Sequence, residues 1–143
     1  MATRSTITVK ISENKYKTIY CHWDGYLSNN GLNLYENVTT KEKALALLEK
    51  GDMSSLRFDQ DGNNISEYYK DRGEENTDAR EIRDINQIDW QGFNYLWEDG
   101  QWKVDVNDNF DPLIDALMAD NESRPRLKQK PVNYCPHCGK KIE

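Results

Sequence analysis

The stretch 93–106 constrains the fold more than any other part of the chain, because both its turn and its alternation are typical of a β-hairpin. Asp99-Gly100 is a residue pair that two-residue hairpin turns prefer. Folding the chain about this turn sets four pairs opposite each other: Glu98 and Gln101, Trp97 and Trp102, Tyr95 and Val104, and Phe93 and Val106. One face of the hairpin is then aromatic or branched, and a sheet must bury such a face. We expect it to pack under a helix; a platform for a ligand is the alternative.

A second β-hairpin is predicted over 6–23, with a polar turn at 12–15. In its second strand, Ile19, Cys21 and Trp23 share one face, whereas Tyr20 and His22 share the other. The remaining elements are helices at 32–37, 39–51, 78–88 and 111–118, and a short strand at 56–58. Together they predict an α+β fold, in which an antiparallel sheet built from two hairpins is packed by two or three helices.

Two of these helices have capping signals. Thr39 and Glu42 form the pattern of a capping box ahead of an apolar run, and Gly51 suits the left-handed end of that helix. Asp111 is the expected cap of the last helix, with Pro112 at its first position. The apolar stripe of that helix, which we expect to cover the aromatic hairpin, comprises Leu113, Ile114, Leu117 and Met118.

The length of 143 residues suits one domain with a core, and its aromatic residues (4 Trp, 8 Tyr and 3 Phe) argue against a disordered chain. We expect an α+β domain over 1–121 and a tail over 122–143 that begins as a basic linker. The charge divides in the same way, since residues 1–123 hold 13 Lys+Arg against 24 Asp+Glu, and residues 124–143 hold 6 against 1. No apolar run reaches the roughly 20 residues of a membrane span.

The tail contains half of a zinc site. The string Cys135-Pro136-His137-Cys138-Gly139 resembles a zinc-ribbon knuckle, in which two thiolates two residues apart lie on one tight turn. A structural zinc takes four ligands, and a ribbon carries its second pair about 15–20 residues away. Outside this string, the chain has only Cys21 and His22 as further Cys or His residues. The metal ligands Cys135 and Cys138 therefore lack an evident second pair.

Three outcomes stay open for this half-site. Two chains can each donate Cys135 and Cys138 to one zinc across a two-fold axis, which predicts a homodimer. Within one chain, only one of Cys21 and His22 can reach a shared metal, since adjacent strand residues point to opposite faces. The last outcome is a knuckle with free or oxidised thiols on a mobile tail. An odd number of Cys and a start without the apolar stretch of a signal peptide predict a cytoplasmic protein.

Two polar clusters are candidate binding residues. His22, Asp24 and Tyr26 form either a surface site or a turn around a structural histidine. Asp71 and Arg72 lie in the charged stretch 68–75, where they present an arginine to an anionic or aromatic ligand or form a local ion-pair turn. No phosphate-binding, dinucleotide-binding or hydrolase motif is present, and opposite strand faces separate Cys21 from His22 as a dyad. We therefore predict that the protein is not an enzyme.

Several strings resemble a family of small phage and prophage proteins. The most distinctive is Tyr20-Cys21-His22-Trp23-Asp24-Gly25-Tyr26, and others lie at 1–7, 41–45, 51–56, 69–74 and 95–102. The resemblance implies a phage accessory protein that acts in a bacterial cytoplasm, and it brings no catalytic residue. The terminal knuckle is not part of the resemblance, which suggests an appended element.

We predict a non-enzymatic phage or prophage accessory protein that binds a host factor and inhibits a bacterial defence or nucleic-acid-handling system. The residues predicted to contact this partner are His22, Asp24, Tyr26, Asp71 and Arg72. One alternative is nucleic-acid binding by the basic tail, through Arg124, Arg126, Lys128, Lys130, Lys140 and Lys141 with the knuckle as scaffold. The other is sequestration of a small nucleotide-like ligand by the aromatic and arginine loops.

Overall fold

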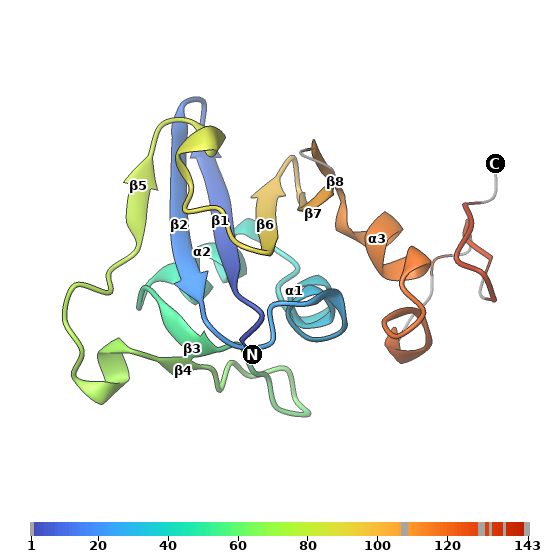
Figure 1. The fold of residues 1–143 in the computed structure, drawn as a ribbon, viewed down its shortest axis with the longest axis horizontal. Helices are drawn as coiled ribbons and strands as arrows, with labels where there is room; N and C mark the ends of the chain where they lie inside the picture. The colour runs from blue at the N-terminus through green and yellow to red at the C-terminus, as the bar shows by residue number, and fades with distance from the viewer. Residues whose placement is uncertain (1, 107–108, 129–130, 132, 136, 142–143) are drawn as a thin grey trace.

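The computed structural model describes residues 2–106, 109–128, 131, 133–135 and 137–141. Within them the chain forms an α+β fold around one eight-stranded sheet (Figure 1). The strands are β1 (Ser5–Ser12), β2 (Lys15–Cys21), β3 (Met53–Ser55), β4 (Glu67–Tyr68), β5 (Arg80–Ile82), β6 (Phe93–Glu98), β7 (Gln101–Val106) and β8 (Asn109–Pro112). Their order is β4-β3-β2-β1-β6-β7-β8, and β5 pairs with the part of β2 that precedes its contact with β3.

Three α-helices and four shorter helical turns complete the described part of the chain. The α-helices are α1 (Leu32–Asn37), α2 (Lys41–Leu48) and α3 (Leu113–Ala119). The turns are η1 (Leu27–Gly31), η2 (Lys70–Arg72), η3 (Ile85–Gln87) and η4 (Arg124–Arg126). Among the residues that the structure describes, no helix has the length and apolar character to cross a membrane.

Both predicted hairpins are present, β1 with β2 and β6 with β7. In the second hairpin, Trp97 lies opposite Trp102 and Tyr95 opposite Val104, as the sequence predicts. Both residues of its turn have positive φ, which two-residue turns of this kind require. The two indole rings meet edge to face with centroids 5.5 Å apart, and the Trp102 indole N–H donates to the Val38 carbonyl at 2.8 Å. The aromatic face is therefore buried in the core.

The sheet is mixed, which corrects the prediction of an antiparallel one. The two hairpins join through their first strands, because β1 pairs with β6 in parallel and sets Ile7 opposite Tyr95. Cys21 of β2 also pairs in parallel with Met53 of β3. β2 brings the chain back to the end of the sheet at which β1 begins, since Cys21 lies opposite Ser5, and the connection 22–92 starts and finishes at that end, so β6 runs in the direction of β1.

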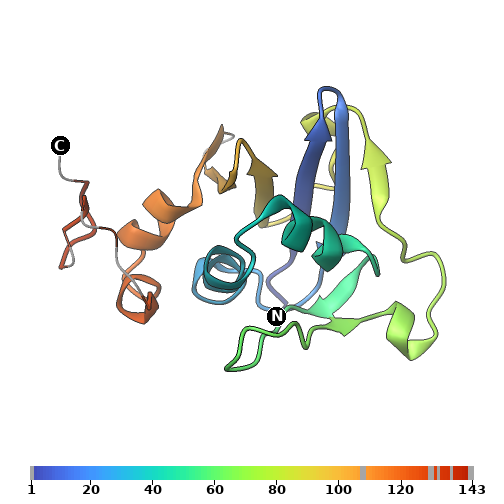
Figure 2. The same ribbon diagram turned by 180° about the vertical axis from the view of Figure 1, so that it is seen from behind.

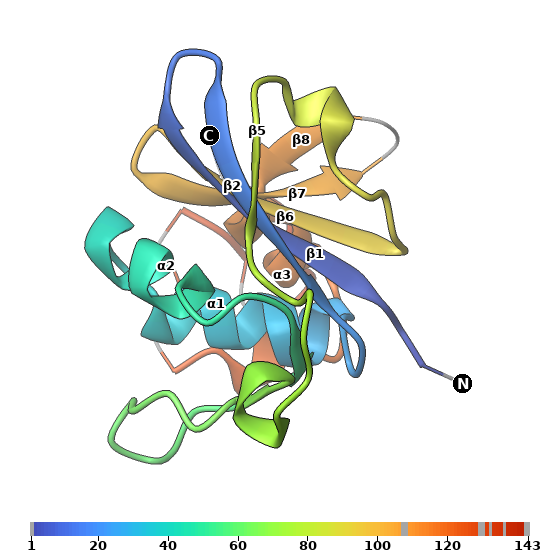
Figure 3. The same cartoon turned by 90° about the vertical axis from the view of Figure 1, so that its left-hand side faces the viewer.

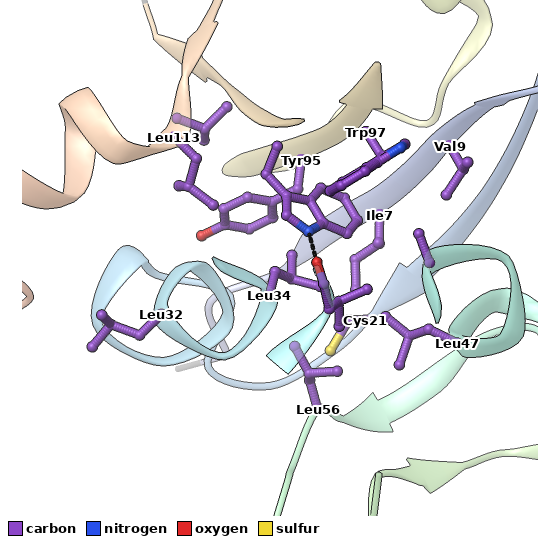
Figure 4. Close-up of a cluster of buried hydrophobic side chains, with 14 of the residues drawn as sticks. Ile7, Val9, Cys21, Leu32, Leu34, Leu47, Leu56, Tyr95, Trp97 and Leu113 are labelled. Atoms are coloured by element: carbon purple, nitrogen blue, oxygen red, sulfur yellow. Dashed lines mark hydrogen bonds between the residues drawn. The ribbon is translucent and has the colours of Figure 1, made fainter. Parts of the chain in front are cut away.

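The helices cover one face of the sheet, and the core lies between the two layers (Figure 2). α2 contacts β1 and β2, and α3 contacts β7, so the predicted helical cover of the aromatic hairpin is confirmed. Figure 4 shows Tyr95 and Trp97 of the sheet among Leu34, Leu47 and Leu113 of the helices. All five side chains are buried.

Two helices begin one residue later than predicted. Thr40, not Thr39, is the N-cap of α2, and its hydroxyl accepts a hydrogen bond from the N–H of Lys43 at 3.2 Å. Pro112, not Asp111, precedes the first turn of α3. Asp111 belongs instead to β8, because the backbone there continues to pair with β7 up to the start of the helix.

The segment 78–88 does not form the predicted helix. Its first part is β5, which runs antiparallel to β2 and sets Ile82 opposite Tyr16, and its second part is the short turn η3. The isoleucine spacing fits a helical face, but the open edge of β2 offers backbone partners that this segment takes up instead. The short strand predicted at 56–58 lies at Met53–Ser55, where it extends the same edge.

The face of the sheet opposite the helices carries buried polar side chains. The hydroxyls of Thr8 and Thr18 share a hydrogen bond of 2.8 Å, and Thr6 donates to the Asn94 side chain at 2.8 Å. The segment 83–92 connects β5 to β6 on this side of the sheet (Figure 3). These four side chains are thus hydrogen-bonded, as most buried polar groups are.

The described part of the tail packs against the domain. Leu127 and Tyr134 are buried in the same apolar cluster as the helices and the sheet. The backbone N–H of Lys128 donates to the Glu36 carboxylate of α1 at 2.9 Å. Lys130, which the nucleic-acid hypothesis includes, lies outside the described residues.

Candidate functional site

The chain leaves the sheet after Cys21 in a tight turn that exposes two large aromatic side chains. The N–H groups of His22 and Trp23 donate to the carbonyls of Met53 and Ser54, at 3.2 and 2.9 Å. Asp24 then reverses the chain with a φ of 56°, a conformation in which Asp is one of the better tolerated residues. Trp23 is 46% exposed and Tyr26 is 38% exposed, so both rings face solvent.

The exposure of Trp23 corrects the prediction that it shares the core face with Ile19 and Cys21. Strand alternation places Ile19 and Cys21 correctly, and both are fully buried. The alternation no longer holds at Trp23, because the strand ends at Cys21 and the turn at Asp24 rotates the chain. The Asp24-Gly25 turn signal, which begins three residues after Cys21, is the feature of the sequence that points to this break.

The side chains around this turn form two groups of contacts, one of Tyr20, His22 and Trp23 and one of Asp24 and Tyr26. The Tyr20 hydroxyl and Nδ1 of His22 share a hydrogen bond of 2.6 Å, as two residues on one strand face can. The imidazole meets the Trp23 ring edge-on, with centroids 4.7 Å apart. The Tyr26 hydroxyl donates to the Asp24 carboxylate at 3.3 Å. We call Tyr20, His22, Trp23, Asp24 and Tyr26 the aromatic turn.

Both tyrosines of the aromatic turn are held in the neutral, hydrogen-bonding form. Partial burial is the main cause that raises the pKa of Tyr20. Partial burial and then the charge of Asp24 raise the pKa of Tyr26. Each phenol therefore keeps its proton near neutral pH and presents a polar tip on an apolar ring, a combination that suits protein interfaces.

Buried groups fix the backbone beneath the aromatic turn. The Tyr95 hydroxyl donates to the Gly25 carbonyl at 2.7 Å, and the Gly25 N–H donates to the Thr3 carbonyl at 2.8 Å. A Cβ at residue 25 would lie 2.8 Å from that same carbonyl, so glycine is required there by close approach. The buried Asn30 side chain donates to the Ser5 hydroxyl at 3.0 Å and so holds the far end of the loop.

Asp71 and Arg72 are not part of the aromatic turn. They belong to η2, which follows β4 at the edge of the sheet, two strands away from β2. Asp71 pairs with Lys50 at 3.2 Å. Arg72 pairs with Glu67 and Glu74 at 3.3 and 3.8 Å, and its guanidinium lies over the Tyr69 ring at 5.4 Å. These contacts are those of a local ion-pair turn.

The knuckle of the tail forms a closed turn. A bridge pairs Tyr134 with Lys141, the Cys135 N–H donates to the Lys140 carbonyl at 2.8 Å, and the Gly139 N–H donates to the Cys135 carbonyl at 2.8 Å. Hydrogen bonds from the backbone amides of Cys138 and His137 lower the pKa of the Cys135 thiol. The turn is therefore closed by its own backbone hydrogen bonds.

The remaining candidate ligands are placed away from the knuckle. Cys21 is fully buried, and burial raises the pKa of its thiol, so it behaves as a small core residue. Nδ1 of His22 is engaged by Tyr20. In the part of the chain that the structure describes, no group of three or more His, Cys, Asp or Glu side chains is arranged to hold a metal ion.

Arg124, which is one of the predicted phosphate-binding residues, is used in hydrogen bonds within the fold. Arg124 is only 8% exposed, and its guanidinium donates to the Met118 carbonyl at 2.7 Å and to the Asn121 side chain at 2.9 Å. The first of these bonds gives a hydrogen-bond donor to a backbone carbonyl in the last turn of α3. The exposed basic residues of the described tail are Arg126, Lys128, Lys140 and Lys141.

No protein-family model, curated protein or solved structure matches the chain. The resemblance to small phage and prophage proteins therefore stays a prediction from the sequence. A function has to be argued from the geometry of the aromatic turn and of the knuckle.

Proposed function

We propose that the protein is a non-enzymatic binding protein whose aromatic turn contacts a partner protein. The observation that carries the proposal is the exposure of Trp23 and Tyr26 on a backbone that buried hydrogen bonds hold in place. Trp and Tyr dominate the energetics of protein interfaces, and rings fixed before binding lose little conformational entropy. Such rings are therefore suited to anchor a partner.

The contacts within the aromatic turn add to this argument. Trp23 is supported edge-on by His22, which is in turn hydrogen-bonded to Tyr20, so the indole has a fixed support. Asp24 provides a carboxylate beside the rings, and residues 1–123 are strongly acidic. A partner with a basic rim around an apolar pocket would match this surface in shape and charge.

The sequence resemblance sets the biological context of the proposal. It supports a phage or prophage accessory protein in a bacterial cytoplasm, for which the partner is a host factor of a defence or nucleic-acid-handling system. The nucleotide hypothesis has less support, because Arg72 is already paired with two carboxylates. The nucleic-acid hypothesis also has less support, because the Arg124 guanidinium is bonded to the Met118 carbonyl within the fold.

Affinity capture with matched variants tests the proposal. Tagged wild-type protein, the Trp23→Ala/Tyr26→Ala double variant and Trp90→Ala are compared as baits in bacterial lysate. Trp90 is the control because it is 44% exposed, like Trp23, but its ring lies beside Phe110 of β8. Thermal unfolding of all three baits shows whether each one is folded.

We expect one host protein to be retained by the wild type and by Trp90→Ala and lost by the double variant. Loss of an anchor of about 2 kcal/mol weakens binding roughly 30-fold, which can be measured on the purified pair. If the double variant retains the same protein with unchanged affinity, the aromatic turn is not the interface. A bait that captures nothing above background, while a control bait works, removes the proposal altogether.

A further inference from the structure

The two residues that flank the cysteine pair, Tyr134 and Gly139, pack against α3. Gly139 has a φ of 77° and lies so close to the Met118 carbonyl that a Cβ would be 1.7 Å from that oxygen. The Arg124 guanidinium donates to the same carbonyl at 2.7 Å. Tyr134 is only 6% exposed and its hydroxyl bonds to the Asp115 carboxylate of α3. The residues on both sides of the two cysteines are thus anchored to α3.

Both sulfurs of the knuckle can be reached from outside the molecule. Cys138 is exposed and Cys135 is partly exposed. The two residues are joined by the tight turn in which the Gly139 N–H donates to the Cys135 carbonyl. Paired thiolates on such a turn are the half-sites from which structural zinc centres are built.

The described residues do not supply a second half-site. Cys21 is enclosed in the core, where its sulfur accepts from the Asn30 side chain at 3.4 Å. His22 is held in the aromatic turn by Tyr20. His137 lies between the two cysteines on the same turn, where its short tether keeps it from closing a tetrahedron with them. In the described ranges, no cluster of three or more ligand side chains exists.

We propose that one Zn²⁺ is bound between two copies of this chain, with Cys135 and Cys138 of each copy as its four ligands. A two-fold axis through the metal makes the interface isologous, since the same knuckle is used twice. On binding, four thiols lose their protons and form four Zn–S bonds, which leaves a centre with a net charge of −2.

The charges around the knuckle fit such a centre. Lys140 and Lys141 follow the second cysteine directly, and the Arg124 guanidinium lies beside Gly139, where a Cβ would be 2.9 Å from its Nη1. Two copies would bring four lysines to a doubly negative centre. The basic character of the tail then has an explanation that does not involve nucleic acid.

Native mass spectrometry of the full-length protein, stripped of metal and titrated with Zn²⁺ under reducing conditions, tests the proposal. We expect a dimer with a single zinc ion that returns to monomers on addition of a chelator. With Co²⁺ in place of Zn²⁺, we expect the visible and sulfur charge-transfer absorption of a tetrahedral tetrathiolate centre. Cys135→Ser and Cys138→Ser should each abolish both signals.

His137→Asn is the matched control, because it changes the residue between the two cysteines and should leave the zinc-bridged dimer intact. Thermal unfolding shows that the variants remain folded, since neither thiol belongs to the core. A monomer with one zinc, a dimer that survives the chelator, or no uptake of zinc at all would each overturn the proposal. Loss of the dimer in His137→Asn would also overturn it, since the ligand set would then include that imidazole.

Discussion

Replacing Tyr95 with Phe tests how the fold holds the aromatic turn. The Tyr95 ring is fully buried between the sheet and the helices, and its hydroxyl donates to the Gly25 carbonyl at 2.7 Å. Gly31 lies next to the same hydroxyl, since a Cβ at residue 31 would be 3.4 Å from the Tyr95 oxygen. One hydroxyl is therefore placed against both ends of the loop that follows the aromatic turn.

The Tyr95→Phe change removes this tie and leaves the volume of the ring in place. A buried polar group that loses its partner costs about 1–3 kcal/mol, and here the Gly25 carbonyl loses this donor. We expect a loss of about 1–3 kcal/mol in the free energy of unfolding, or roughly 2–12 °C in Tm for a chain near this length. Hydrogen exchange should speed up at the amides of 25–31, measured by mass spectrometry of proteolytic fragments.

Tyr68→Phe is the matched control for this prediction. The Tyr68 hydroxyl is also buried and donates to a carbonyl, that of Leu47, at 2.7 Å. Its loss should lower Tm by a similar amount without loosening the loop 25–31 or weakening a partner held by Trp23. If both variants exchange equally in that loop, or if Tyr95→Phe has the stability of the wild type, the proposed support of the aromatic turn is refuted.

Three further variants probe the tail. Arg124→Gln should lower stability by about 1.5–3 kcal/mol in chemical denaturation, because a charged donor to the Met118 carbonyl is lost; an unchanged midpoint would contradict this. Gly139→Ala should undock the knuckle, seen as faster tryptic cleavage at Lys140 with the Tm of the domain nearly constant. Burial, followed by the bond to Asp115, raises the pKa of Tyr134 to about 12. Since the unfolded phenol titrates near pH 10, the stability that Tyr134 contributes is complete below about pH 10 and is lost as pH rises through 12. We measure the tyrosinate absorbance of the wild type and of Tyr134→Phe as a function of pH. The difference between the two should develop near pH 12 and not near pH 10.

Local patterns in the sequence predict the hairpins well. The Asp99-Gly100 turn fixes the register of β6 and β7, so the partners of Trp97 and Tyr95 follow from counting alone. The cap of α2 is displaced by only one residue, because neighbouring threonines carry the same signal. In these elements, the residues that determine the structure lie within a few positions of it in the sequence.

Pairings between distant segments could not be predicted in this way. The parallel contact of β1 with β6 joins residues such as Ile7 and Tyr95, and neither hairpin needs the other to form its own turn. Ile82 fits a helical pattern in the sequence, yet it lies opposite Tyr16 because the edge of β2 is open there. Such choices depend on which edges the rest of the chain leaves free.

The candidate site was only partly predictable for the same reason. Alternation along β2 correctly sets Tyr20 and His22 on one face, where they share a hydrogen bond. The alternation does not extend to Trp23, because the turn at Asp24 interrupts it. The ion pairs of Arg72 depend on Glu67 as well as its neighbour Glu74, so a short charged string does not reveal whether its arginine is free.

The tail and the aromatic turn are coupled through the loop that separates Tyr26 from α1. Ser28 is buried in that loop, its carbonyl accepts from the Arg126 guanidinium at 3.5 Å, and its hydroxyl donates to Glu122 at 3.4 Å. Further along the tail, Leu127 and Tyr134 are buried in the core, and each such side chain stabilises the fold by about 1.5–3 kcal/mol.

Removing residues 123–143 would therefore expose the core and loosen the support of the aromatic turn, in addition to deleting the knuckle. We expect the truncated chain to lose several kcal/mol of stability and to bind the partner of Trp23 more weakly, whereas Cys135→Ser, compared with the wild type in the absence of zinc, should change neither. A truncated chain with the wild-type Tm would contradict the packing of the tail. A binding defect after truncation does not by itself implicate the basic side chains, and the substitution of Lys140 and Lys141 by Gln, which leaves the buried contacts in place, is the experiment that does.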